Sequence, residues 1–356
     1  MADGIDKLDR YRAMRDFGET PEPAGAPPSP AGNNRFVVQQ HSATRLHWDL
    51  RLERDGVLAS WACPRGIPHD PKRNNLAVHT EDHPLEYIDF HGEIPDGNYG
   101  AGTMTVWDTG TYDTIKWEDR EVMVTLHGSK VEGTYVLFQT KERDWMIHRM
   151  DPPQDPERQP LPAGLRPMIP VDDELPEDEE AWGFEVRWGG LRTLLTSEQG
   201  TVTIHDGDGR DVTEKFPEIR RIGRDLGSLE MVLDGEVVAL HEGRPDAERL
   251  EWRVAAEGDS RIRRLARDTP VVFMACDLLW LEGHSTMGLS YEERRTLLDE
   301  MEIKGAAWQA PAYHAGAGSA LLDAVRAQGL GGVLAKRLDS LYEPGQQSEA
   351  WRSVDA

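Results

Sequence analysis

A row of three side chains suited to phosphate chemistry, His47, Asp49 and Arg51, alternates with Trp48 and Leu50 in one segment. This period of two is typical of a β-strand with one apolar face and one polar face. Imidazole and carboxylate groups together bind cations of the manganese or zinc type. A guanidinium beside them grips a phosphate in a bidentate manner. The chemistry indicated is metal-assisted attack on a phosphate ester.

Two further groups of residues favour a site over the alternative, a solvated strand face with incidental histidines. His41 is separated from His47 by an even number of positions. Its side chain therefore joins the same strand face if the intervening chain stays extended or turns back. Glu81, His83 and Tyr87 share one parity and could supply a ligand or general acid, a phosphate donor and a hydroxyl. The alternative for residues 81–87 is a loop before a strand, because Pro84 has no N–H to donate to the hydrogen bonds of a β-sheet.

The elements that must position these residues differ between the two halves of the chain. The first half predicts strands at 37–39, 46–52, 58–62, 76–80, 102–107, 122–126 and 134–139. Many short, closely spaced strands indicate a small β-barrel or sandwich. The second half predicts helices at 213–226, 246–256, 291–301 and 319–328, and strands at 231–240, 271–281 and 332–337. The fold class expected is therefore α+β in two domains.

Two linkers divide the chain by composition. Residues 20–34 form a Pro/Gly-rich tether that is not expected to pack, and residues 151–181 form a Pro-rich, acidic connector. The domains expected are an arm with its tether (1–34), a phosphoesterase-like barrel (35–150), the linker (151–181) and a second domain (182–356).

Composition limits the surroundings and the partners. With 356 residues, 38% of them hydrophobic, the chain can build two cores. Cys63 and Cys276 lie far apart and form no framework, which fits a reducing cytoplasm, and no apolar run reaches membrane-spanning length. The net charge of −24 opposes broad, non-specific binding to DNA. A DNA-end enzyme of this charge must concentrate its cations at the site or be delivered by a partner.

Five ordered motifs within residues 8–150 carry a resemblance to a known family. They span residues 36–41, 47–51, 60–66, 81–87 and 92–102. This region resembles the 3′-phosphoesterase domain of the bacterial end-joining DNA ligase D family. The resemblance implies a small β-barrel that uses manganese, trims 3′-terminal ribonucleotides and removes 3′-phosphates from DNA, leaving a 3′-hydroxyl.

The resemblance also implies residue roles, position by position. The metal ligands would be His41, His47 and Asp49. The groups that hold or protonate the phosphate would be Arg51, His83 and Tyr87, supported by Glu81, with Arg15, Asp16 and Glu22 contributed by the arm.

Two positions depart from the family pattern. Arg65 stands where the family usually has lysine, which keeps a phosphate-binding charge but changes its geometry. Asn75 stands where the family usually has arginine, and Arg73 compensates only if its loop shifts. If Asn75 limits the grip on phosphate, arginine at this position should raise the rate.

The second half resembles the adenylation domain of ATP-dependent DNA ligases, through residues 182–192, 233–240, 273–283 and 329–337. Its reactive positions have changed. Arg187 replaces the nucleophilic lysine, and an arginine cannot supply the neutral amine for a phosphoramide bond. The other replacements are Gly189 for aspartate, Cys276 for the adenine-stacking ring, Gly331 for glutamate, and Ser353 and Asp355 for two lysines. The chain ends without an oligonucleotide-binding domain, so we expect a pseudo-ligase without ATP use.

The function predicted is a manganese-dependent 3′-phosphoesterase or 3′-ribonuclease, a hydrolase that heals DNA 3′ ends in end-joining repair. Other divalent metals also suit its ligands. Its partners would be primer-template ends with a 3′-phosphate or 3′-ribonucleotide and end-joining proteins, in the cytoplasm at the nucleoid, with no membrane. The pseudo-ligase half would be a scaffold, a partner surface or a weak nucleotide site at Lys336, Arg192 and Glu236. The alternative is a non-catalytic adaptor for DNA ends or for a repair partner.

Overall fold

The computed structural model describes residues 7–25, 34–43, 46–227 and 229–356. The start of the predicted arm (1–6), most of the predicted tether (26–33) and residues 44–45 of the first polar segment lie outside the described residues. The chain divides into a first unit, Met1–Pro156, and a second unit, Glu157–Ala356. Each unit has its own sheets and its own core.

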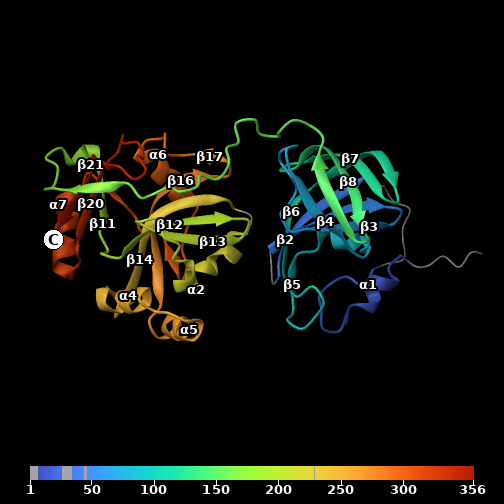
Figure 1. Ribbon diagram of the computed structural model, residues 1–356, viewed down its shortest axis with the longest axis horizontal. Coiled ribbons are helices and arrows are strands. Elements are labelled where there is room, and N and C mark those ends of the chain that lie inside the picture. Colours follow the sequence, from blue (N-terminus) through green and yellow to red (C-terminus); the bar gives the residue numbers. More distant parts are fainter. Residues whose placement is uncertain (1–6, 26–33, 44–45, 228) are drawn as a thin grey trace, which may run out of the picture. The chain divides into compact units, whose positions relative to one another are not determined.

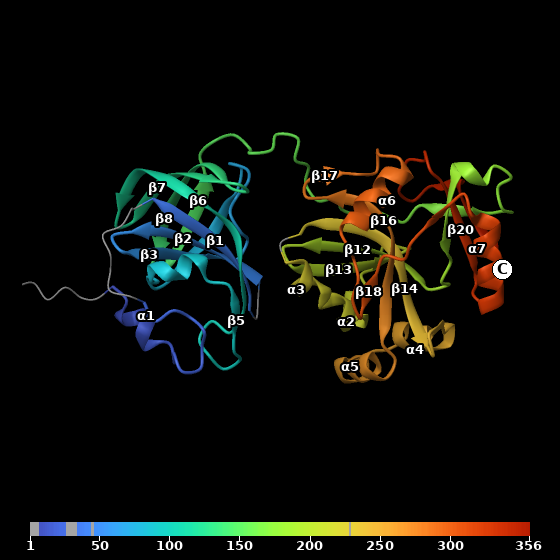
Figure 2. The same cartoon turned by 180° about the vertical axis from the view of Figure 1, so that it is seen from behind.

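The first unit is a closed barrel, as predicted (Figure 1; Figure 2). Its sheet has the order β1-β2-β3-β4-β9-β8-β7-β6-β5, and the additional pairing of β1 with β6 closes eight of these strands into a ring. The strands are β1 (Arg35–Ser42), β2 (Leu46–Arg54), β3 (Val57–Cys63), β4 (Asn74–His79), β5 (Gly92–Ile94), β6 (Gly102–Glu118), β7 (Glu121–Gly128), β8 (Glu132–Lys141) and β9 (Asp144–Arg149).

Alternation along β2 separates the two faces of the barrel wall. Trp48, Leu50 and Leu52 point into the main core, where they pack with apolar residues from the other strands. Asp49 and Arg51 point outward, yet both are buried. The alternative of a solvated polar face is therefore wrong, because another layer of the chain covers this face.

The covering layer comes from two segments distant in the sequence. Its elements are α1 (Asp9–Ala13), the 3-10 helix η1 (Leu85–Asp89) and β5. Both views show α1 and β5 at the same end of the barrel (Figure 1; Figure 2). A second, smaller core joins this layer to the barrel through Leu8, Tyr11, Val37, Leu58, Tyr87, Ile88 and Met104. Residues 20–25, predicted as unpacked tether, belong to this layer, and Thr20 and Glu22 are buried in it.

The second unit is α+β, as predicted, with two sheets and helices against them (Figure 2). One sheet has the order β10-β21-β20-β11-β19, and the other β13-β12-β14-β16-β17 with β15 and β18 at its margins. The strands are β10 (Ile169–Asp172), β11 (Trp182–Val186), β12 (Leu191–Glu198), β13 (Thr201–Asp206), β14 (Met231–His241), β15 (Arg244–Pro245), β16 (Val271–Leu281), β17 (His284–Ser285), β18 (Trp308–Gln309), β19 (His314–Ala315), β20 (Gly332–Arg337) and β21 (Gln347–Asp355). The helices are α2 (Pro217–Arg220), α3 (Ile222–Leu226), α4 (Ala247–Val254), α5 (Asp259–Asp268), α6 (Tyr291–Glu300) and α7 (Gly318–Gln328), with 3-10 turns η2 (Glu179–Ala181) and η3 (Thr213–Lys215).

Two expectations for this unit need correction. The predicted linker 151–181 is partly structural, because β10 pairs with β21 and Met168 is buried in a core cluster. The single helix predicted at 213–226 is three short elements: η3 ends at Lys215, Pro217 starts α2, and α3 follows from Ile222. In the part of the chain that the structure describes, no helix is long and apolar enough to cross a membrane.

Candidate active site

The β1–β2 hairpin lines up the proposed metal ligands. In its register His41 lies opposite His47, and Gln39 lies opposite Asp49. Residues directly opposite each other in an antiparallel pair point to the same face. Strand pairing thus places all four side chains together on the outer face of the barrel, under the covering layer.

The two imidazoles and the carboxylate have the spacing of a cation site. Nδ1 of His41 is 3.2 Å from Nε2 of His47, and carboxylate oxygens of Asp49 lie 3.9 and 3.7 Å from these nitrogens. One ligand atom from each residue lies within 4.8 Å of the others. Two nitrogens that share one ion at about 2.1 Å lie roughly 3 to 3.5 Å apart. The donor set therefore fits a divalent cation.

A backbone carbonyl fixes the orientation of one ligand. Nε2 of His41 is 2.9 Å from the carbonyl oxygen of Gly100, which can only accept, so we assign the proton of His41 to Nε2. The lone pair on Nδ1 then faces His47 and Asp49. Burial lowers the pKa of His41, which favours the neutral imidazole that metal binding requires.

Arg51 is held in place beside the ligands. Its Nε donates to Oε1 of Gln39 at 2.7 Å, and its Nη2 donates to Asp49 at 2.9 Å. Its guanidinium carbon also lies 4.7 Å from the centre of the Tyr87 ring. The role of Gln39 was missed from the sequence, although its parity with His41 is a signal that could have found it.

The arm contributes a second buried guanidinium, that of Arg15. Its Nε donates to Glu22 at 2.7 Å and its Nη1 to Glu81 at 3.2 Å, while Nη2 lies 3.2 Å from Nε2 of His83. The Arg15 side chain is only 4% exposed. Of the three residues predicted in the arm, the structure brings Arg15 and Glu22 into the site. Asp16 is exposed and accepts the N–H of Gly18, so it lies outside the buried network.

His83 is held between cations as a neutral ring. Its backbone pairs with Leu58 of β3, and its Nδ1 lies 2.8 Å from the carbonyl of Glu81. We assign the proton to Nδ1, which donates to this carbonyl and leaves Nε2 to accept from Arg15. Nη1 of Arg51, 3.1 Å from the same Nδ1, then contacts the ring without a hydrogen bond. Burial, aided by Arg51 and Arg15, holds the pKa of His83 well below its ordinary value near 6.5. In this state His83 binds as a neutral group and is not a protonated acid.

This depressed pKa predicts acid sensitivity of the first unit. As the pH falls below about 6.5, His83 takes up a proton in the unfolded chain but not in the folded one, so folding stability is full above this pH and declines below it. We expect the His83→Gln variant to lose stability less steeply between pH 6.5 and 5 in metal-free buffer, measured by denaturant unfolding. The matched control is His127→Gln, which alters an exposed histidine paired with Asp113. Equal slopes for both variants would contradict the assignment.

Tyr87 reaches the site by a route that parity did not predict. It lies in the 3-10 helix η1 instead of an extended strand, and its hydroxyl donates to Oε1 of Glu22 at 2.9 Å. Burial raises the pKa of Tyr87 well above its ordinary value. The hydroxyl is therefore a neutral hydrogen-bond donor.

The two departures from the family pattern have different surroundings. Asn75 is buried, and its side-chain amide donates to the carbonyl oxygens of Arg65 at 3.0 Å and Gly66 at 2.9 Å. Asn75 thus holds the turn after β3, and an arginine in its place would have to make these two bonds in its stead. The Arg65 side chain is exposed and lies outside the buried network.

In the second unit, four of the substituted ligase-like positions contact one another. Arg187 donates through Nη1 to Oγ of Ser353 at 2.6 Å. Its Nη2 bonds to the carbonyl of Gly331 and to the carboxylate of Asp355. Gly189 adopts a positive φ of 68° in the turn that follows Arg187. Four of the replacements, Arg187, Gly331, Ser353 and Asp355, therefore form one local network that ties the start of β20 and the end of β21 to the chain after β11.

The residues retained in the second unit are engaged internally. The Arg192 guanidinium forms a fork with Asp234 at 2.7 and 2.6 Å. Glu236 accepts the N–H of Gly190 at 2.7 Å and lines a recess together with Cys276. Burial raises the pKa of Glu236 above its ordinary value, and it raises the pKa of Cys276 to about 12, so the thiol keeps its proton at neutral pH.

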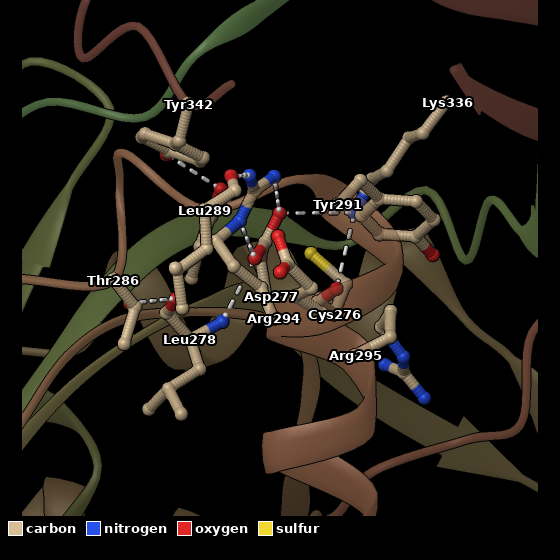
Figure 3. Close-up of polar contacts among 12 residues, drawn as sticks. Cys276, Asp277, Leu278, Thr286, Leu289, Tyr291, Arg294, Arg295, Lys336 and Tyr342 are labelled. Carbon is tan, nitrogen blue, oxygen red and sulfur yellow. Dashed lines mark hydrogen bonds and ion pairs between the residues drawn. The ribbon is translucent and has the colours of Figure 1, made fainter. Parts of the chain in front are cut away.

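Lys336 lies in a buried cluster beside this recess. Its Nζ is 3.1 Å from both Glu185 and the carbonyl of Cys276. Burial acts to lower the pKa of Lys336, but Cys276, Glu185 and Asp277 outweigh it and raise that pKa. Figure 3 shows this cluster, with Arg294 of α6 facing Asp277 of β16. A lysine that stays protonated offers no free amine to replace the missing nucleophile.

Comparisons with known proteins agree with the division of the chain into two units. Residues 39–139 match the DNA Ligase D 3′-phosphoesterase domain family, and residues 168–354 match the ATP dependent DNA ligase domain family. The multifunctional non-homologous end joining protein LigD of Mycolicibacterium smegmatis is 41% identical over 97% of this chain and 45% of its own length. The Pseudomonas aeruginosa LigD is 32% identical over 97% of this chain and 46% of its own length.

A solved structure, the ligase domain of Mycobacterium tuberculosis LigD, is 34% identical over 53% of this chain and 58% of that one, with a TM-score of 0.46. The chain spans about half the length of the curated relatives it matches.

Proposed function

Because the chain belongs to the LigD family, with a 3′-phosphoesterase domain followed by an ATP-dependent ligase adenylation domain, we propose that it heals DNA 3′ ends during end-joining repair. The reaction is hydrolysis of a 3′-terminal phosphate, or removal of a 3′-terminal ribonucleotide, to leave a 3′-hydroxyl. Manganese is the proposed metal, and the proposed setting is the nucleoid in the cytoplasm. The second unit is proposed to be inactive as a ligase.

The observation that carries this proposal is the junction of two clusters on one face of the barrel. His41, His47 and Asp49 form the proposed cation site, and Arg51, which donates to Asp49, places its Nη1 3.1 Å from Nδ1 of His83. Isolated buried charges are costly, whereas a dry site lined with fixed donors favours a bound anion. A phosphate ester beside a divalent cation has both the charge and the size to complete such a site.

Within this proposal each side chain has a defined task. His41, His47 and Asp49 would hold the cation, which when bound supplies a Lewis acid and an activated water. Arg51 uses Nε and Nη2 on Gln39 and Asp49, so further N–H groups remain for phosphate oxygens.

The second cation proposed to face the phosphate is Arg15. Glu22 and Glu81 fix its guanidinium by ion pairs, and its Nη2 lies against Nε2 of His83. Tyr87 orients Glu22. His83 orients the Arg15 guanidinium by accepting from it. Because these groups are already bonded to one another, little reorganisation is needed when the substrate binds.

The direct test is conversion of a DNA primer-template that ends in a 3′-phosphate or in a single 3′-ribonucleotide, with manganese. We expect a 3′-hydroxyl product from the wild type and none from His47→Ala, which removes a ligand whose side chain is 22% exposed and therefore replaceable without opening the core. Unchanged turnover in the variant would remove His47 from the site. Tight binding of the DNA end without conversion by the wild type would favour a non-catalytic adaptor instead.

The absence of ligation is proposed from the network around Arg187. An arginine keeps its proton under all relevant conditions, so it cannot attack the α-phosphate of ATP. Asp355 and Ser353 bond to Arg187 where the family has two lysines, which changes the local charge. Asp355 would itself compete with a nucleotide phosphate for any cation placed there.

Restoring the lysine alone should therefore not restore adenylation. We expect the Arg187→Lys variant, incubated with ATP and magnesium, to show the unmodified mass by intact mass spectrometry, because Gly189, Cys276 and Gly331 remain. In this variant Asp355 would pair with the new lysine. An AMP adduct on the variant, absent from the wild type treated in parallel, would overturn the pseudo-ligase proposal.

A further inference from the structure

Tyr99 is an exposed aromatic ring at the edge of the site. Its residue is 45% exposed. Among the described residues of the first unit it is the only aromatic residue in the exposed class, since the other aromatic side chains there are buried or half-buried. An isolated exposed ring is unremarkable on most surfaces, but its position beside a phosphate-handling site gives it a use.

The loop that carries Tyr99 is built into the metal side of the site. Two turns shape it, through bonds from the N–H of Asn98 to Pro95 and from the N–H of Ala101 to Asn98. Gly100, the next residue after Tyr99, has a positive φ of 77° and presents its carbonyl to His41 at 2.9 Å. The residue next to Tyr99 in the chain therefore bonds to His41, a proposed metal ligand, which fixes where the Tyr99 ring begins.

The same ring also borders the phosphate side of the site. The guanidinium carbon of Arg15 lies 5.5 Å from the centre of the Tyr99 ring and 3.9 Å from the centre of the Tyr11 ring. Tyr11 is buried, whereas Tyr99 is on the solvent side. A nucleotide whose phosphate is gripped near Arg15 would carry its base within reach of the exposed ring.

We propose that Tyr99 is a stacking platform for the base of the 3′-terminal nucleotide. This inference rests on the proposed function, and it adds a subsite that makes the enzyme sense a base next to the phosphate. Stacking on an aromatic ring tolerates every base, because each base has a π-face. The subsite thus favours a nucleoside over a bare sugar at the terminus without sequence preference. The competing role for Tyr99 is as a simple cover over Arg15.

Two substrates separate these roles. Both are primer-templates with a 3′-phosphate, and they differ only in the terminal residue, which is thymidine in one and an abasic tetrahydrofuran sugar in the other. With the full chain and manganese, we expect the wild type to prefer the thymidine substrate by roughly tenfold in kcat/KM. The Tyr99→Ala variant should bring this ratio close to one, and Tyr99→Trp should keep it.

Two more variants act as controls. Tyr99→Leu keeps an apolar cover over Arg15 but removes the π-face, so it should also lose the preference. Ile115→Ala removes an exposed apolar side chain of β6, 56% exposed, and should leave the ratio unchanged.

A fall in turnover of both substrates by the same factor in Tyr99→Ala would assign Tyr99 the covering role and overturn the inference. Equal turnover of the two substrates by the wild type would overturn it as well. If the wild type converts neither substrate, the proposed function fails on its own. In that case the ratio of the two dissociation constants, measured by fluorescence anisotropy with manganese, decides whether the base is recognised through Tyr99.

Discussion

The Asp49→Asn variant is expected to lose at least about 100-fold of the manganese-dependent turnover while its barrel stays folded. Loss of a group that only supports a metal ligand costs about 10- to 100-fold in affinity or activity. Removal of a charged ligand should cost more. Asparagine keeps an oxygen that can accept from Nη2 of Arg51, which Asp49 now binds at 2.9 Å, so the local packing survives. What it removes is the negative charge between two imidazoles and a guanidinium.

The measurement is a manganese titration of turnover on a 3′-phosphate primer-template, with metal affinity from calorimetry and folding from circular dichroism. Asp113→Asn is the matched control, because Asp113 is also a barrel carboxylate that pairs with a histidine, His127 at 2.9 Å, but is 81% exposed. We expect this control to behave like the wild type. Normal turnover in Asp49→Asn, or equal losses in both variants, would place the metal elsewhere.

The second large effect is expected on stability, from the buried ion pair of Arg294 and Asp277. Both side chains are fully buried. Nε and Nη2 of Arg294 bond to the two carboxylate oxygens at 2.7 and 2.9 Å, and Nη1 bonds to the carbonyls of Leu289 and Ser340. The Arg294→Met variant leaves the Asp277 charge without its main partner in a dry core. Such an uncompensated charge costs about 3–5 kcal/mol.

Denaturant unfolding of the full chain, followed through the transition of the second unit, measures this cost. Arg337→Met is the control, since Arg337 forms the same fork with Asp339 at 3.0 Å but on the surface. An exposed pair of this kind is worth at most about 1 kcal/mol. Similar small losses for both variants would mean that Lys336, 3.9 Å from Asp277, already compensates its charge.

The fold could be predicted best where local pattern and environment agree. Strand β2 was predicted at 46–52 and runs from Leu46 to Arg54, because apolar and polar residues alternate along its length. The pattern failed for β9 (Asp144–Arg149), a short strand at the end of the first unit. It also failed for the helix predicted at 213–226, because the helical period does not show that Pro217 keeps Phe216 out of the helical conformation.

The site shows the same limit. His41, His47 and Asp49 belong to one hairpin, so spacing alone could bring them together. Arg15 and His83 are 68 positions apart. Parity singled out His83, whereas Arg15 was predicted only through the family resemblance. The Gly100 carbonyl could not be found at all, because every residue has a backbone carbonyl and no residue type marks the one that orients a ligand.

Strand β1, which carries His41, also has a consequence for folding. It pairs with β2, its neighbour in the sequence, and with β6, which is much farther along the chain. The pairing of β1 with β6 therefore closes the barrel. A cation bound by ligands from both β1 and β2 would bind appreciably only to the folded, closed barrel and not to the unfolded chain. By mass action, saturation at 100 times the dissociation constant would then add about 2.7 kcal/mol to the unfolding free energy. The melting temperature of the first unit should consequently rise with manganese concentration, so thermal shift reports occupancy even in variants that no longer turn over.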